Sequence, residues 1–582
     1  MSTLVFGRGR AVAQTRSLAM SADGIAVAGL ALLGASLVVL TWGTWGDLGR
    51  DTGYDLVAGA RVAHGQLPYA DFPYYYGPVA PFLLGLAAWI GGDGLTPAIV
   101  VGLIVAAVIV GLTYALARTF VGAVGAFLAS AIVMGVAVSP TNFSYVLPHT
   151  EAMTLGMAAL LALLLALARM PASPSTPWLV AAGVPAGIVA LTKPELEVAA
   201  LAAALAWFVA RGLPFRSICA FAAPALGIPA FVYGAFLTQV SLHALVFDNL
   251  YPTRVLQAGG DKILRLHAPL TIPSLVHHAE HIVLYAAGIG TMFSLAWLID
   301  RSPRGLRFVY AGVALAVAYV ALTNLETTRS TLQLVYGWIP GGAAIAAVLL
   351  ATAFRREQGA SAGLALTVAL AIVGGTTYAA FYFHADHPQT AVYFAPLAAV
   401  FLAALHLRAL VDSRTIALLG VCWLAFLAAT GVALAVDDAR AETVVISGPG
   451  GSINVGTGDA NAYRGALGDI VRSTKPGESM LVAPQLAALY TLSGRTDALP
   501  NISLLPGMLG GVPGEQQAIA QLKAAHVRLI VTDQHEFTEY GQGAFGATFD
   551  TTLATWVARN FYRLGTYPGQ SHTLVVWRRN RP

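Results

Sequence analysis

The sequence predicts a polytopic α-helical membrane protein of about 13 transmembrane helices, followed by a C-terminal extracytoplasmic α/β domain. Of its 582 residues, 57% are hydrophobic and 11% are charged, and the mean hydropathy is +0.69, which suits a bilayer better than water. Long apolar segments recur without an alternating strand pattern, so helices are the form in which this chain can span hydrocarbon. Residues 437–582 hold 12 of the 33 Lys and Arg residues, which indicates a soluble part there.

Fourteen apolar segments supply the candidate spans. They lie at 25–42, 79–91, 97–117, 121–138, 152–168, 178–192, 196–210, 217–238, 282–299, 308–323, 331–354, 361–383, 391–407 and 415–436. The first follows Arg8, Arg10 and Arg16 without a convincing small-residue cleavage site, so we expect it to be retained as a span. Residues 79–91 are too few for a crossing of roughly 30 Å, which favours an interfacial or re-entrant helix and leaves 13 spans.

Positive charge in the short loops predicts the orientation of the spans. Arginines recur after every second span, and the N-terminal arginines join the same set: Arg211 with Arg216, Arg301 with Arg304 and Arg307, Arg355 with Arg356, and Arg408 with Arg414. We expect this face to be cytoplasmic, and the loops 46–78 and 243–280 and the tail 440–582 to lie outside. The loop arginines also account for the net charge of +4, so we expect no nucleic-acid partner.

The tail alternates helix-like and strand-like segments, which favours a small α/β domain. The helix-like segments are 459–473, 515–526 and 548–560, and the strand-like segments are 480–482, 528–532 and 573–577. The Gly-rich stretch 448–458 predicts a loop and not a phosphate cradle, because it carries no G-x-G-x-x-G motif between a strand and a helix. The acidic residues of the tail, Asp533 and Glu536 among them, are scattered, so we expect this domain to flank the cavity without supplying a catalytic base.

The outer loop 46–78 is dense in groups that can carry chemistry. Its sequence includes GDLGRDTGYDLVAGARVAHGQLPYADFPYYYGP, with Asp47, Arg50, Asp51, Tyr54, Asp55, Arg61, His64, Asp71 and the run Tyr74–Tyr76. Charge beside a membrane is costly and usually has a purpose. Leu56, Ala60 and Ala63 share one helical face, which predicts a short helix over 54–64 that lies on the membrane. The tyrosine run fits an interfacial aromatic belt and a binding surface equally well.

The string RDTGYDLVAGARVAHGQLPYADF, with GP four residues later, resembles the first outer loop of the bacterial dolichyl-phosphate-mannose-protein mannosyltransferase-like family. These proteins are relatives of the aminoarabinose transferases and have the C-type glycosyltransferase fold. LYTLSGR and LKAAHVRLIVTD in the tail resemble the outer domain of many members. The resemblance implies an inverting transferase in the bacterial cytoplasmic membrane, with residues 1–439 as the transmembrane glycosyltransferase domain and 440–582 outside.

The resemblance also implies substrates and roles for particular residues. The expected partners are a polyprenyl-phosphate sugar donor, membrane lipid, and a saccharide, lipid or protein acceptor. Asp51 occupies the position of the family's loop aspartate, which makes it the expected general base, with Asp55 one helical turn later as its competitor. Glu151, in TNFSYVLPHTE, matches a second acidic position that in some relatives holds a divalent metal ion with the first. Asp51 and Glu151 are therefore the possible metal ligands, and no cofactor is otherwise indicated.

Glu151 also has a purely structural explanation, because Thr150 before it can cap a helix whose first turn favours an acidic residue. Lys193 with Glu195 and Glu197 in LTKPELE likewise fits either a cavity-facing cluster or an ordinary helix start at Pro194. The expected substrate-binding residues are Arg50, Tyr54, Asp55, Tyr75, His149, Lys193, Arg254, Lys262 and Arg265. The last three are cations in one outer loop, which suits a lipid phosphate.

Two alternatives remain at this stage. His277, His278 and His281 could form a metal cluster, although solvated interfacial histidines explain them more simply. The whole protein could instead be a transporter or flippase of lipid-linked saccharides. Such a protein would be expected to show repeated halves with matched broken helices, and the sequence shows no such repeat.

Overall fold

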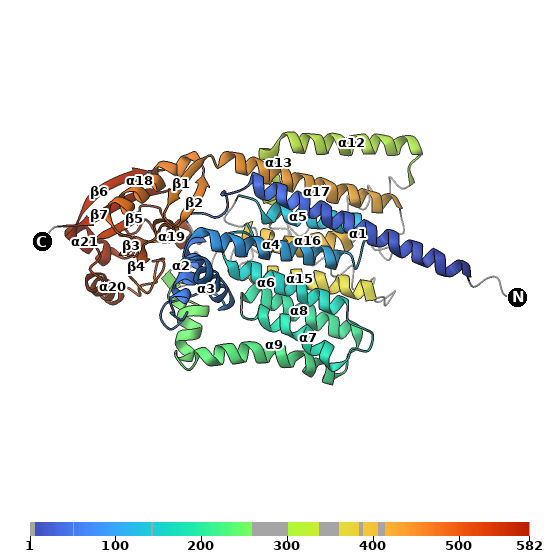
Figure 1. Cartoon of the computed structure of the whole chain (residues 1–582), viewed down its shortest axis with the longest axis horizontal. Coiled ribbons are helices and arrows are strands. Elements are labelled where there is room, and N and C mark those ends of the chain that lie inside the picture. The colour runs from blue at the N-terminus through green and yellow to red at the C-terminus, as the bar shows by residue number, and fades with distance from the viewer. Residues whose placement is uncertain are drawn as a thin grey trace, which may run out of the picture.

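The computed structural model describes residues 6–49, 52–140, 144–255, 257–258, 301–336, 360–382, 388–404 and 414–580. Its helices pack side by side into an elongated bundle, and an α/β domain covers one end of that bundle (Figure 1). The N-terminal helix points away from this domain, toward the opposite end (Figure 1). We call the covered end the domain end.

The bundle is formed by long apolar helices. Those described are α1 (Phe6–Leu40), α4 (Leu95–Ala117), α5 (Ala123–Ala137), α6 (Glu151–Ala168), α7 (Thr176–Val189), α8 (Pro194–Arg211), α9 (Phe215–Phe236), α12 (Arg304–Thr323), α13 (Leu325–Tyr336), α15 (Ala360–Tyr382), α16 (Pro388–Ala404) and α17 (Arg414–Ala441). Five of them, α1, α4, α6, α9 and α17, contain a stretch long and apolar enough to cross a membrane. The count of 13 spans stays a prediction, since 259–300 and 337–359 lie outside the described residues.

Both ends of helix α3 (Val79–Gly91) lie near the same end of the bundle. At its beginning, the backbone of Gly77 donates to Thr192 O over 2.7 Å, in the turn between α7 and α8. Just past its end, the backbone of Leu95 donates to Gly450 O over 2.9 Å, in the α/β domain. Between these points α3 packs along α2 (Thr52–Ala63). This geometry agrees with the interfacial or re-entrant helix expected from the length of 79–91.

The segments expected outside gather at the domain end. The π-helical segment η1 (Ala244–Leu250) contacts the first loop, where Tyr74 N donates to Asn249 Oδ1 over 2.9 Å. Arg329, in α13, binds Asp438 near the end of α17, just before the α/β domain begins. The first loop, η1 and the start of α13 therefore share one side with the α/β domain, as the charge pattern predicts; that this side is the outer one stays a prediction.

The α/β domain is built on a five-stranded mixed sheet of order β4-β3-β5-β7-β6. The strands are β3 (Ser479–Ala483), β4 (Thr496–Asp497), β5 (Leu529–Asp533), β6 (Phe561–Pro568) and β7 (Thr573–Arg579). Strand β3 runs parallel to β4 and β5, whereas β7 runs antiparallel to β5 and β6. The helices are α18 (Thr457–Ser473), α19 (Ala488–Ser493), α20 (Val512–Ala524) and α21 (Thr551–Asn560). Each strand and helix expected from the sequence overlaps one of these elements.

The Gly-rich stretch differs from expectation. It contributes to an antiparallel hairpin of β1 (Val444–Gly448) and β2 (Gly451–Val455), with Pro449 and Gly450 at the turn. A side chain on Gly450 would collide with the backbone of Thr491, at 1.8 Å from its carbonyl oxygen. Glycine is therefore required at this turn, which lies between the domain and the bundle. The expected loop is only the tip of a hairpin.

The domain and the bundle share a core. One continuous cluster of buried apolar side chains includes Leu95 in α4, Tyr54 in α2, Ile446 in β1 and Leu489 in α19. A second cluster lies within the domain, between the sheet and helices α20 and α21. Because burial of apolar area is the main stabilising term in folding, the domain is held firmly on the end of the bundle.

Candidate functional site

The first outer loop forms a helix pressed against the α/β domain. Before α2, Asp47 closes a turn, because its Oδ1 accepts from Gly49 N over 2.8 Å and its own N donates to Thr52 Oγ1 over 3.1 Å. A Cβ atom on Gly53 would lie 1.9 Å from the backbone nitrogen of Ala488, so only glycine allows this approach. The expected short helix is thus present. Most of its residues are buried because α3 and the domain cover it, and its expected position on the membrane stays a prediction.

Asp55 ties this loop to the beginning of α6. One oxygen of its carboxylate accepts from Tyr74 Oη over 2.7 Å, and the other accepts from Glu151 N over 2.7 Å. The side chain is buried, and a carboxylate at a helix N-terminus is stabilised by the unpaired amides and the dipole there. Asp55 therefore has a clear positioning role, with both oxygens engaged.

Glu151, the first residue of α6, is a buried acid with one carboxyl oxygen that lacks a hydrogen-bond partner among the described residues. Thr150 caps the helix, as its hydroxyl accepts from Ala152 N over 3.1 Å, so the structural explanation from the sequence is confirmed. Yet Glu151 is only 2% exposed, and its Oε1 has no hydrogen-bond partner among the described residues. Its Oε2 accepts from Thr154 Oγ1 over 3.2 Å. A buried carboxylate oxygen without a partner is costly, so capping alone does not explain this residue.

Three tyrosines stack beside these acids. Tyr54 lies between Tyr74 and Tyr75, with ring centroids 5.6 and 5.8 Å apart and nearly parallel planes. Burial raises the pKa of Tyr74 well above its usual value, and the neighbouring Asp55 adds to the shift, so this hydroxyl stays protonated and donates. Since Tyr74 is fully buried, the aromatic-belt alternative does not apply to it.

Lys193 and Glu195 lie at an ordinary helix start and also form a buried charged cluster, so both alternatives from the sequence apply. Helix α8 does begin at Pro194, but the two charged side chains are buried and 3.5 Å apart. The Lys193 ammonium also lies 5.1 Å from the centroid of the Tyr76 ring, a cation–π geometry. The pair therefore joins the turn before α8 to the tyrosine run.

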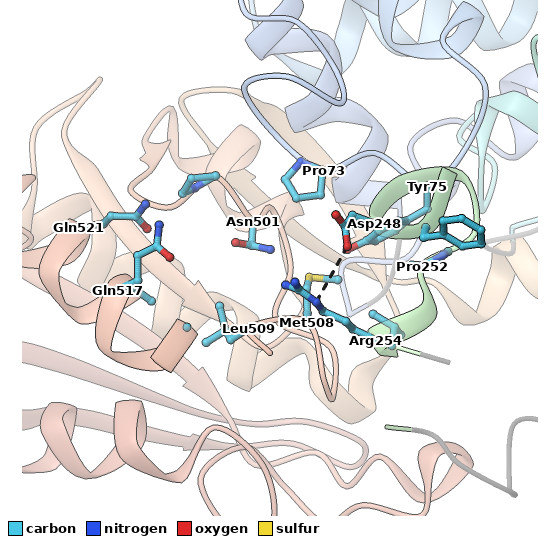
Figure 2. Close-up of a pocket in the computed structure, with 15 residues that line it drawn as sticks. Pro73, Tyr75, Asp248, Pro252, Arg254, Asn501, Met508, Leu509, Gln517 and Gln521 are labelled. Atoms are coloured by element: carbon cyan, nitrogen blue, oxygen red, sulfur yellow. Dashed lines mark ion pairs between the residues drawn. The ribbon is translucent and has the colours of Figure 1, made fainter. Parts of the chain in front are cut away.

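A cavity of about 300 Å³ opens on the other side of Tyr75, between the first loop, the segment after η1 and the α/β domain (Figure 2). Arg254, an expected phosphate contact, lies at this cavity with its Nε 3.9 Å from Asp248 Oδ1. The domain contributes the amide side chains of Asn501, Gln517 and Gln521. Sequence reasoning missed these amides, because a glutamine on a soluble helix carries no motif.

A histidine of the domain also contacts the first loop. His572 Nδ1 lies 2.6 Å from Asp533 Oδ2, and a Cβ atom on Gly49 would lie 2.3 Å from its Nε2. Burial lowers the pKa of His572, but the hydrogen bond with Asp533 and the charges of Asp459 and Asp47 outweigh it, so the pKa is raised. Asp533 is thus not an isolated acid, as the sequence suggested, but half of a buried pair.

Of the other expected site residues, the structure describes His149 but not those at 50–51 and 262–281. His149 lies just before α6, and its backbone nitrogen donates to Tyr393 Oη over 3.0 Å. Arg50, Asp51, Lys262, Arg265, His277, His278 and His281 lie outside the described residues. Among the residues that the structure describes, no three His, Cys, Asp or Glu side chains gather as metal ligands, so the divalent-ion expectation stays a prediction.

Comparison with known proteins addresses the family. Residues 73–234, from the tyrosine run through α9, match the family model described as dolichyl-phosphate-mannose-protein mannosyltransferase. The family resemblance is confirmed. The matched region contains Glu151 and Lys193, whereas Asp51 and Asp55 precede it. None of the curated proteins matches the chain.

Several solved structures are similar over most of the chain. ArnT from Cupriavidus metallidurans bound to undecaprenyl phosphate has 14% identity and a TM-score of 0.45, covering 94% of this chain and 97% of that one. Its apo state has 15% identity and a TM-score of 0.45, covering 95% and 98%. The archaeal oligosaccharyltransferase AglB from Archaeoglobus fulgidus, with an inhibitory peptide and a dolichol-phosphate, has 16% identity and a TM-score of 0.49, covering 96% and 74%.

Proposed function

We propose that this protein is an integral-membrane glycosyltransferase that moves a sugar from a polyprenyl-phosphate donor to an acceptor outside the bacterial cytoplasmic membrane. One observation carries the proposal: the Asp55 carboxylate binds the backbone of Glu151, which brings the acid-rich first loop and a buried acid together at the domain end. The head group of a membrane-anchored donor must lie at such a surface. The family match over 73–234 supports the same function.

In the proposed reaction, Asp51 is the general base. It accepts the proton of an acceptor hydroxyl while that oxygen attacks the anomeric carbon of the donor sugar. The bond between this carbon and the phosphate oxygen breaks, and polyprenyl phosphate leaves with the electron pair, which inverts the anomeric centre. Asp51 directly precedes Thr52, the first residue of α2, and this helix is anchored by Gly53 and Asp55. A well-anchored base is what positional catalysis requires.

Other residues support this step in the proposal. Glu151 offers its open oxygen to a sugar hydroxyl, since a hydroxyl is the partner that a buried carboxylate most readily gains. Lys193, buried beside Tyr76, provides positive charge for the leaving phosphate. Asp55 and Tyr74 hold the loop in place. We derive no step through a metal ion.

The deciding experiment uses the full chain in nanodiscs with undecaprenyl phosphate that carries a radiolabelled sugar. A panel of donors with different sugars is needed because the sugar is not known. A transferase releases free undecaprenyl phosphate in proportion to protein. In sealed vesicles, movement of intact donor between leaflets without cleavage of any donor would instead establish the transporter or flippase.

A further inference from the structure

The cavity between the first loop and the α/β domain adjoins the candidate site. Tyr75 lines the cavity and stacks on Tyr54, Tyr54 stacks on Tyr74, and the Tyr74 hydroxyl binds Asp55. One aromatic stack thus separates the cavity from the buried acids. Its volume of about 300 Å³ lies at the lower end of the roughly 300–1,000 Å³ usual for small-molecule sites.

Three primary amides face this space from the domain. Figure 2 shows Asn501, Gln517 and Gln521 on one side and Tyr75, Asp248 and Arg254 on the other. None of the three amide side chains makes a hydrogen bond to another described residue; Asn501 and Gln521 are half-buried, and Gln517 is exposed. Each amide offers two donors and one acceptor. Together they form a surface that can both donate to and accept from neutral hydroxyl groups.

The charge of the lining argues against an anionic ligand. Among the described residues, Arg254 is the one cation in the lining, and it lies 3.9 Å from the carboxylate of Asp248. The neighbouring carboxylate offsets part of the Arg254 charge, so a free phosphate or an acidic sugar gains less here than it would at an unpaired cation. An alkyl chain fits no better, because it would remove the amides from water without giving them partners.

The apolar part of the lining fits a sugar ring. Val255, Met508 and Leu509 are buried, and the half-buried Tyr75 presents an aromatic ring to the same space. A saccharide has hydroxyl groups at its edge and C–H groups on its face, so it can use amides and an aromatic ring together. We propose that this cavity is the acceptor subsite and that the acceptor is a neutral saccharide; the subsite role rests on the proposed function.

Direct binding tests the ligand class without requiring turnover. Saturation-transfer NMR on the full chain in nanodiscs uses three proton-bearing kinds of probe: neutral methyl glycosides with a neutral disaccharide, glucuronate, and a short serine- and threonine-containing peptide. Inorganic phosphate, which has no carbon-bound protons, is followed by the broadening of its phosphorus NMR line. We expect signals from the neutral sugars alone. In the double variant Gln517→Ala/Gln521→Ala, and in Asn501→Ala, this binding should weaken about tenfold or more.

Gln516→Ala is the matched control, because Gln516 is an exposed glutamine on the same helix, α20, outside the cavity lining. It should bind sugars as the unmodified protein does, and thermal unfolding should show that all the variants are folded. Binding of the peptide, glucuronate or phosphate in place of neutral sugars, or sugar binding insensitive to the three amides, would overturn the proposal.

Turnover separates the two proposals. Donor cleavage measured with water as the only acceptor depends on the transferase function alone. With the bound saccharide added, the amide variants should raise the KM for that saccharide far more than they lower kcat, whereas Gln516→Ala should leave both constants and the water reaction unchanged. Sugar binding that depends on the amides, without donor cleavage, would leave a saccharide site but reject the transferase. Donor cleavage with no sugar binding would support the transferase but reject the saccharide site.

Discussion

Arg61 of the first outer loop binds the carboxylate of Asp497 in the α/β domain, and both side chains are almost completely buried. Arg61 Nη1 also donates to Pro500 O over 2.8 Å, next to the cavity. Removing one partner of such a pair leaves a buried, uncompensated charge. We expect Asp497→Ala to destabilise the protein by about 3–5 kcal/mol.

Denaturation of the detergent-solubilised protein measures this effect. The double variant Arg61→Leu/Asp497→Leu should recover much of the loss, because it leaves no buried charge. Arg528→Ala is the control, since the exposed Arg528 lies 3.9 Å from Glu478 and such a surface pair contributes roughly 0–1 kcal/mol. An equal loss in this control would mean that burial of the pair is irrelevant.

Asp51 and Asp55 should respond differently to the same change. Asp51→Asn should lower transfer by about 10²–10⁴-fold with folding and donor binding retained, as expected for removal of a general base. Asp55→Asn keeps one acceptor oxygen but loses the other, so it should mainly lower the thermal unfolding midpoint. Near-normal turnover of Asp51→Asn, with Asp55→Asn folded but inactive, would move the base to Asp55.

Tyr74→Phe tests the positioning of Asp55. The change removes the hydroxyl that donates to Asp55 and leaves a buried carboxylate oxygen short of one partner, which costs roughly 1–3 kcal/mol. Tyr562→Phe, at an exposed position in β6, should cost almost nothing. Equal unfolding free energies for both variants would show that the Tyr74 hydroxyl has no such role.

His572 should make the stability of the protein depend on pH. Its pKa is raised in the folded state, so the protonated form is favoured there. This contribution is complete below the ordinary value of 6.5 and is lost as the pH rises through the folded-state pKa. The unfolding midpoint should therefore fall above neutral pH, and His572→Asn should flatten that fall. His526→Asn, at an exposed turn, should leave the profile unchanged.

Asp550 makes the stability depend on pH in a lower range, for a different cause. Burial, with a smaller effect of Glu515, raises the pKa of Asp550 to about 7. Its carboxyl thus stabilises the fold below the unfolded value of 3.8 and loses that contribution as the pH rises through about 7. Asp550→Asn cannot ionise and tolerates the left-handed backbone at this position. It should be more stable than the unmodified protein at pH 8, and the difference should shrink as the pH falls below about 7 and vanish below 3.8.

The sequence predicted those features that depend on local pattern. The short length of 79–91 favoured an interfacial or re-entrant helix, which stays a prediction, and Thr150 was correctly expected to cap α6. The contact between Asp55 and Glu151 joins residues 96 positions apart in the sequence, so no local pattern predicts it. Periodicity could place Asp55 on α2 but could not choose its partner.

Three features were missed for identifiable physical reasons. The hairpin of β1 and β2 was hidden because glycines at its turn weaken the strand signal. Gln517 and Gln521 resemble ordinary surface residues of a soluble helix, and only the fold turns them toward the first loop. His572 follows a loop and gains meaning only when β7 places it beside Asp533.

The shared core of bundle and domain also determines when this protein can begin to work. Arg61 and Asp497 are 436 residues apart, so in the proposed orientation the first loop is outside long before its partner strand has been synthesised. Until then Gly53 has no α19 to pack on, and the cavity lacks the wall that carries its amides. A nascent chain that has already inserted most of its helices therefore carries an unfinished site. If the proposed orientation and function hold, export of the last domain is the maturation step, and a ribosome-bound intermediate should not consume lipid-linked sugar.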